Sequence, residues 1–147
     1  MKLFAPNTRP ALLSTLWVVL MLNYLYCDVL GLYDPHHLVA LQEQTIGGVP
    51  FTPEALVAAG VLMQIPIAMV LLSRVLRQGL ARWVNVATAT VMGAVQVSTL
   101  FFGTPPTPVY AFFSAIEIAL AIAIVAIALT WRRASEPVAH ENRTVAA

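Results

Sequence analysis

Four long apolar stretches, almost free of charged residues, constrain the fold of this chain more than any other feature of its sequence. A helix that crosses the apolar core of a bilayer, about 30 Å thick, needs about 20 such residues. Three prolines within 103–108 divide the last apolar region, because residues of this kind cannot continue a helix. The predicted helices cover about 10–31, 53–77, 81–102 and 109–131. The sequence therefore predicts an all-α fold, a bundle of four transmembrane helices.

The composition agrees with a membrane protein and excludes an ordinary soluble domain. Of the 147 residues, 59% are hydrophobic and only 10% are charged, whereas soluble domains average about 25% charged residues. We expect a single transmembrane domain at 1–133, followed by a polar, disordered cytoplasmic tail at 134–147. The net charge is +1 and the basic residues form no dense patch, so we expect neither a nucleic-acid partner nor a polybasic lipid-binding arm.

The distribution of basic residues predicts the orientation in the membrane. Lys and Arg in short loops stay on the cytoplasmic side. All eight precede the first helix, surround the turn between the second and third, or follow the fourth: Lys2, Arg9, Arg74, Arg77, Arg82, Arg132, Arg133 and Arg143. We therefore predict that the N-terminus and the C-terminus are both cytoplasmic, in a multi-pass protein of a bacterial inner membrane.

The exterior loop after the first helix carries a second helix-start signal. Asp34 as N-cap with Pro35 at the first helical position predicts a short interfacial helix. His36 and His37 are metal-ligand types, but adjacent helical residues point about 100° apart. We interpret them as exposed helix-start residues and expect no metal site. Cys27, the only cysteine, is interpreted as a small core residue.

Glu117 is the most informative residue for function. An ionisable side chain inside a membrane segment is costly and normally faces the protein interior or a wet cavity. The helical period puts small and polar residues on its face: Tyr110, Ser114, Glu117, Ala121 and Ala128. We therefore predict a role for Glu117 in handling a proton or a substrate.

Polar residues of the other helices are predicted to lie near Glu117. Counted along each helix, Asn23, Gln64 and Gln96 fall in the same layer as Glu117, while Asp28 lies nearer the exterior surface, at the mouth of a cavity. The candidate ligand-binding or proton-binding residues are Glu117, Asp28, Asn23, Tyr24, Gln64 and Gln96. For Gln64, Gln96 and also Asn85 a purely structural role, as hydrogen bonds between helices, is the favoured alternative.

The sequence contains no pattern typical of an enzyme. We find no pairing of a nucleophile with a base, no phosphate-binding loop and no dinucleotide fingerprint, and we predict no cofactor. Enzymatic activity is left open, with a non-enzymatic protein favoured.

Three segments carry a resemblance to a known family: LWVVLMLNYLYCDVLG at 16–31, MQIPIAMVLLSRVL at 63–76 and FFSAIEIA at 112–119. The chain resembles an uncharacterised family of short bacterial four-helix membrane proteins, which implies a topology but no activity. In architecture alone it is also similar to the DoxX-like group. Some members of that group serve as quinone-linked oxidoreductase subunits.

Three functions remain open from the sequence. The first is the binding or movement of a small molecule or proton through the intramembrane polar cluster. The second is a membrane subunit of a quinone-linked redox enzyme, and the third is an accessory or assembly subunit. The expected partners are the lipid bilayer, a small-molecule ligand and a second copy of the chain. The second copy would cover a stripe of small residues: Ala111, Ala115, Ala119 and Ala123.

Overall fold

The computed structural model describes residues 8–46, 49–50, 52–101 and 106–131, which form five helices and one short strand pair. The elements are α1 (Arg9–Gly31), α2 (Pro35–Gln42), β1 (Thr45–Ile46), β2 (Val49–Pro50), α3 (Pro53–Val75), α4 (Gln78–Thr99) and α5 (Pro108–Leu129). The predicted tail at 134–147, and with it Lys2, Arg132, Arg133 and Arg143, lies outside the described residues. So does most of the proline-rich turn after the third predicted helix.

Side-chain caps explain where three helices begin. The Asp34 carboxylate accepts a hydrogen bond from the His36 amide, and the Thr52 and Thr107 hydroxyl oxygens accept from amides one turn into α3 and α5. Each of these caps is followed by a proline, whose missing N–H costs nothing in a first turn. The predicted short helix after the first long helix is therefore present as α2.

The predicted boundaries of the four long helices agree with the structure to within three residues. The largest difference is in α4, predicted at 81–102 and found three residues earlier at both ends. Only two residues, in extended conformations, separate α3 from α4, so α4 begins before the position that we assigned. The antiparallel pair of β1 and β2 was not predicted.

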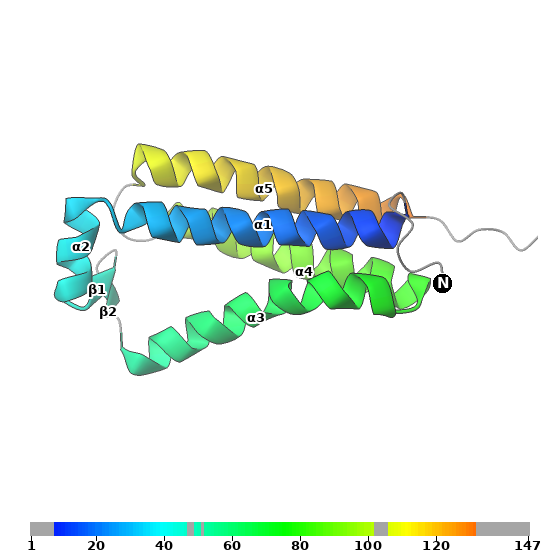
Figure 1. Ribbon diagram of the computed structural model, residues 1–147, viewed down its shortest axis with the longest axis horizontal. Helices are drawn as coiled ribbons and strands as arrows, with labels where there is room; N and C mark the ends of the chain where they lie inside the picture. The colour runs from blue at the N-terminus through cyan, green and yellow to red at the C-terminus, as the bar shows by residue number, and fades with distance from the viewer. Residues whose placement is uncertain (1–7, 47–48, 51, 102–105, 132–147) are drawn as a thin grey trace, which may run out of the picture.

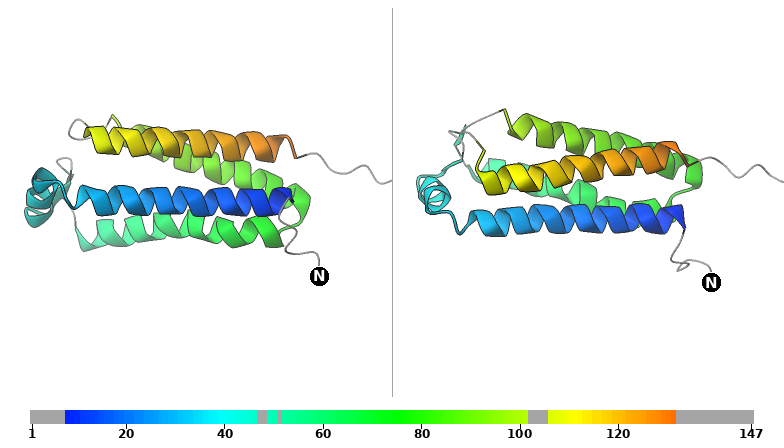
Figure 2. Two further views of the ribbon diagram at one scale, coloured as in Figure 1. Left: turned by 45° about the horizontal axis from the view of Figure 1, so that its top comes forward. Right: turned by 90° about the horizontal axis from the view of Figure 1, so that it is seen from above.

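The four long helices run side by side, and α2 lies across one end of them (Figures 1 and 2). α1 packs against both α3 and α5, and α5 packs against α4. The first residues of α1 and the last residues of α5 meet at the end opposite to α2. There the Arg9 guanidinium donates a hydrogen bond of 3.3 Å to the Thr130 hydroxyl.

The apolar core lies in the half of the bundle that is remote from α2. We call this the closed half: residues 9–20 of α1, 66–75 of α3, 78–92 of α4 and 121–129 of α5. Its fully buried apolar side chains come from all four long helices: Leu13, Trp17, Leu20, Met69, Ala81, Ala89, Met92, Ile124 and Ala128. The closed half therefore contains a packed apolar core, which leaves little room for water between these side chains.

The remaining half of the bundle, next to α2, is less tightly packed, and we call it the open half. The buried residues of α3 begin only at Pro66, and most of the helix before that point is exposed. Figure 1 shows the reason: α3 diverges from α1 toward its own N-terminal end. Proline removes one backbone hydrogen bond inside a helix and commonly marks a bend. The bundle is thus closely packed in the half remote from α2 and splayed in the half next to it.

Three helices, α1, α3 and α5, are long and apolar enough to cross a membrane. α4 is as long as α5 but carries more polar residues. Large apolar side chains cover the outer surface, with Val57, Leu71 and Ile122 each more than 60% exposed. Such a surface is costly in water and suited to lipid.

Candidate functional site

The candidate site is built around Glu117 in the middle of α5. Its side chain is only 2% exposed, and it shares one buried stripe with Ser114 and Ala121. The spacing of three and four residues along this stripe is that of a single helical face. The helical face predicted from the sequence is therefore the face that α5 buries against the rest of the bundle.

Asn23 of α1 holds the Glu117 side chain. Its amide nitrogen donates a hydrogen bond of 2.9 Å to Glu117 Oε1 and a second, of 3.2 Å, to the backbone oxygen of Phe113. Both N–H groups of the Asn23 side-chain amide therefore donate to acceptors on the same turn of α5. Asn23 positions the carboxyl group and joins α1 to α5, and the predicted meeting of these two residues is present.

Gln96 of α4 bonds to the turn beside the carboxyl group. Its amide donates to the Ser114 hydroxyl at 2.9 Å, and Ser114 lies one turn before Glu117 on the same face. One turn nearer the end, the Tyr110 hydroxyl donates to Thr99 Oγ1 at 2.6 Å. These two bonds tie α4 to α5 along the open half. Gln96 thus acts between helices, as in the structural alternative, and it also supports the wall of the site.

Gln64 is placed differently from our expectation. It is exposed on the diverging part of α3, whereas the prediction put it in one layer with Asn23, Gln96 and Glu117. The prediction measured depth along each helix and assumed four nearly parallel axes. Because α3 leans away from α1 in the open half, equal depth does not bring Gln64 to the other three residues.

Tyr24 and Asp28 continue the site toward the open end. Tyr24 is partly buried next to Asn23 and lies within electrostatic range of Glu117. Asp28, one turn farther along α1, is exposed and also lies within electrostatic range of Glu117. Both residues therefore lie within electrostatic range of Glu117, on the part of α1 that leads from Asn23 to the open end.

His37 joins this group, although its place at a helix start led us to interpret it as an exposed residue. It is partly buried, its ring lies over Gly31 near the end of α1, and it interacts electrostatically with Asp28. A Cβ atom built on Gly31 would lie 3.8 Å from His37 Cδ2. The short link between α1 and α2 was the available signal, because it keeps the first turn of α2, which carries His37, close to Gly31.

The charges in the described residues are segregated along the bundle. The acidic residues all lie in the open half or at its end: Asp28, Asp34, Glu43, Glu54 and Glu117. The arginines all lie at the closed end: Arg9, Arg74, Arg77 and Arg82. Among residues 8–46, 49–50, 52–101 and 106–131, Glu117 has no basic side chain as hydrogen-bond partner. No group of three metal-ligating side chains occurs in the same ranges.

Comparison with known proteins gives a family. A family model described as "Family of unknown function (DUF6326)" matches residues 1–137. The chain belongs to DUF6326. No curated protein and no solved structure matches it. The predicted membership of an uncharacterised family is thereby confirmed, whereas the DoxX-like architecture and the bacterial source gain no support from these comparisons.

A second polar cluster of this DUF6326 chain lies in the closed half and has a structural character. Asn85 is fully buried; its Oδ1 accepts from Trp17 Nε1 at 2.7 Å and lies 3.0 Å from Ser73 Oγ. Its amide nitrogen donates to the Ala81 backbone oxygen at 2.8 Å. One side chain thus connects α1, α3 and α4. The sequence predicted that Asn85 forms hydrogen bonds between helices, but it did not predict that the partners are Trp17 and Ser73.

Proposed function

We propose that this DUF6326 chain is an integral membrane protein whose four long helices all cross the bilayer, with both termini in the cytoplasm. Support for the fourth span, α4, comes from its burial pattern. Two polar residues in its interior, Asn85 and Gln96, face the bundle and are hydrogen-bonded there. Its outward positions include exposed Val91 and Val97, which suit lipid. An even number of spans also agrees with α1 starting, and α5 ending, at the arginine-rich end.

Cys27 offers a test of this topology. It is the only cysteine, it is partly buried on α1, and it lies four residues, or about 6 Å, before the end of that helix. We expect a membrane-impermeant maleimide added to intact cells to label it from outside. As the matched control, Arg77→Cys in a Cys27→Ser background should be labelled only after permeabilisation. The reverse pattern would exclude the proposed orientation.

The function that the geometry supports best is the binding and movement of a proton or a small polar molecule at Glu117, reached through the open half. The observation that carries this proposal is a carboxyl group that is 2% exposed and held by an amide rather than by a cation. Without a permanent counter-charge, such a group is stabilised by taking up a proton or a polar ligand. A purely structural fastener would not require an ionisable side chain.

The arrangement around Glu117 supports access from one side. The closed half, packed with Leu20, Met92 and Ile124, separates the carboxyl group from the arginine-rich end. Toward α2 the helices splay apart, and Asp28 and His37 lie on that side, within electrostatic range of each other. The proposed path therefore runs from His37 and Asp28 at the exterior surface to Glu117. Movement to the other side requires the closed half to open.

Mass spectrometry of small molecules that co-purify with the protein tests this function. We expect a polar ligand in the wild-type protein that is lost in Glu117→Gln and retained in Gln64→Leu, a change at an exposed position outside the site. A co-purified quinone would favour the redox-subunit alternative. If the protein carries no ligand and shows no proton flux, a role as an accessory or assembly subunit is the alternative that remains.

A further inference from the structure

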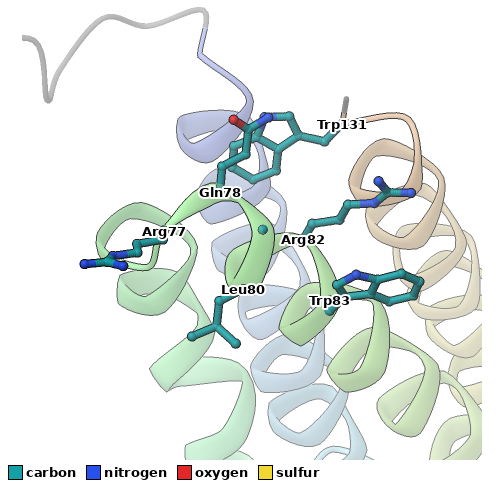
Figure 3. Close-up of a pocket in the computed structure, with 7 residues that line it drawn as sticks. Arg77, Gln78, Leu80, Arg82, Trp83 and Trp131 are labelled. Atoms are coloured by element: carbon teal, nitrogen blue, oxygen red, sulfur yellow. The ribbon is translucent and has the colours of Figure 1, made fainter. Parts of the chain in front are cut away.

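The end of the bundle remote from α2 carries a pocket that the Glu117 site does not use. It has a volume of about 610 Å³ and is lined by Arg77, Arg82, Trp83 and Trp131, with the first turn of α4 as its floor. Figure 3 shows Arg82 between the two tryptophans, while the exposed Arg77 side chain extends away from them. Ligand pockets commonly have volumes of about 300–1,000 Å³, so this pocket is large enough for a ligand headgroup.

The electrostatic character of the pocket is strongly positive. Two arginines lie in or next to the first turn of α4, where the positive end of the helix dipole already disfavours cations. Among the described residues, the acidic side chains are all in the open half or at its end. No acidic side chain in the described part of the chain therefore balances this charge. An anion bound in the pocket would be stabilised by both guanidinium groups and by the helix terminus.

Two features of the pocket point to a ligand with hydrogen-bond acceptors. The Nε–H of Arg82 is buried and has no hydrogen-bond partner, and a buried unsatisfied donor is costly. The N-cap of α4 is Arg77, whose side chain has no acceptor to offer the first turn, whereas α3 and α5 are capped by threonine hydroxyl oxygens. A phosphate group supplies acceptors at both places.

The tryptophans indicate where such a phosphate would come from. Trp side chains favour the headgroup level of a bilayer, where one end of the ring is apolar and the other is wet. Trp83 is 61% exposed and stacks against the Arg82 guanidinium, 5.3 Å from the ring centroid. This end of the bundle is thus at the interface in the proposed topology. A phospholipid would reach the pocket with its phosphate at the arginines and its chains along α4.

We propose that the pocket formed by Arg77, Arg82, Trp83 and Trp131 binds the phosphate group of an anionic phospholipid. It is independent of the Glu117 site but rests on the proposed topology, which cysteine labelling tests separately. Arg82 supplies the buried hydrogen-bond donor, and the exposed Arg77 supplies a second positive charge at the rim of the pocket. The sequence did not predict this site, because the two arginines that form it are not a dense basic run.

Native mass spectrometry of protein extracted from vesicles of phosphatidylcholine and phosphatidylglycerol tests the proposal. We expect the wild type to retain phosphatidylglycerol preferentially and Arg82→Gln to bind it about tenfold more weakly, as for the loss of a charge-assisted hydrogen bond. Arg9→Gln removes an arginine at the same end but outside the pocket, and Glu117→Gln alters the other site. Both should retain the lipid as the wild type does.

Three outcomes would overturn the proposal. The first is equal retention of phosphatidylglycerol by wild type and Arg82→Gln, and the second is equal retention of the two lipids by the wild type. The third is displacement of the lipid by inorganic phosphate at the same concentration, which would identify a site for free phosphate. If Arg82→Gln does not fold, Arg82→Lys keeps the charge but loses Nε, and Trp131→Leu removes one aromatic lining residue of the pocket. Each of these variants should also weaken retention.

Discussion

Replacing Asn85 with leucine is expected to lower the free energy of unfolding by about 2 kcal/mol, the cost of leaving a buried donor unsatisfied and losing bonds between helices. Leucine is similar in size but accepts no hydrogen bond. The Trp17 indole N–H, which now donates to Asn85 Oδ1 at 2.7 Å, would be left in an apolar core. The Ser73 hydroxyl would lose one of its two acceptors.

Unfolding in detergent micelles, followed by circular dichroism, measures this change. Thr90→Val is the matched control, because Thr90 is exposed on α4 and bonds only to the backbone oxygen of Val86 in its own helix. We expect its effect to stay within about 0.5 kcal/mol. A double variant with Trp17→Phe removes donor and acceptor together and should cost less than the sum of the single changes. An Asn85→Leu protein as stable as the wild type would show that this cluster does not hold the helices.

The sequence was sufficient to predict features that depend on one helix at a time. Uncharged length and proline positions predicted four long helices, and Asp34 with Pro35 predicted α2, all of which are present. The helical period likewise predicted the buried face of α5 and the orientation of Asn23 toward it. Each of these predictions uses only local geometry, which the order of residues determines almost completely.

Features that depend on how helices lean could not be predicted in this way. Gln64 is exposed because α3 diverges from α1. Counting residues along a helix predicts how deep a residue lies but not how its helix is tilted. The approach of His37 to Asp28 depends on how α2 folds back after α1. The arginine pocket combines the turn between α3 and α4 with Trp131 after α5, residues about 50 positions apart in the chain.

Glu117→Gln is expected to abolish proton flux through the protein. Glutamine has nearly the same size and offers an oxygen to the Asn23 amide, so the hydrogen bond of 2.9 Å can be kept. It cannot bind and release a proton, because a side-chain amide does not titrate. If every transported proton must bind to the Glu117 carboxylate, the flux falls to the background of empty vesicles. The variant should remain folded, since the closed half is unchanged.

A pH-sensitive dye trapped in proteoliposomes, with a pH gradient across the membrane, tests the central claim most directly. Glu54→Gln is the matched control, because Glu54 is an exposed carboxylate in the first turn of α3 and outside the site. We predict flux in the wild type and in Glu54→Gln, and background flux in Glu117→Gln. Equal flux in wild type and Glu117→Gln, or a wild type that carries neither proton flux nor a co-purified ligand, would contradict the account.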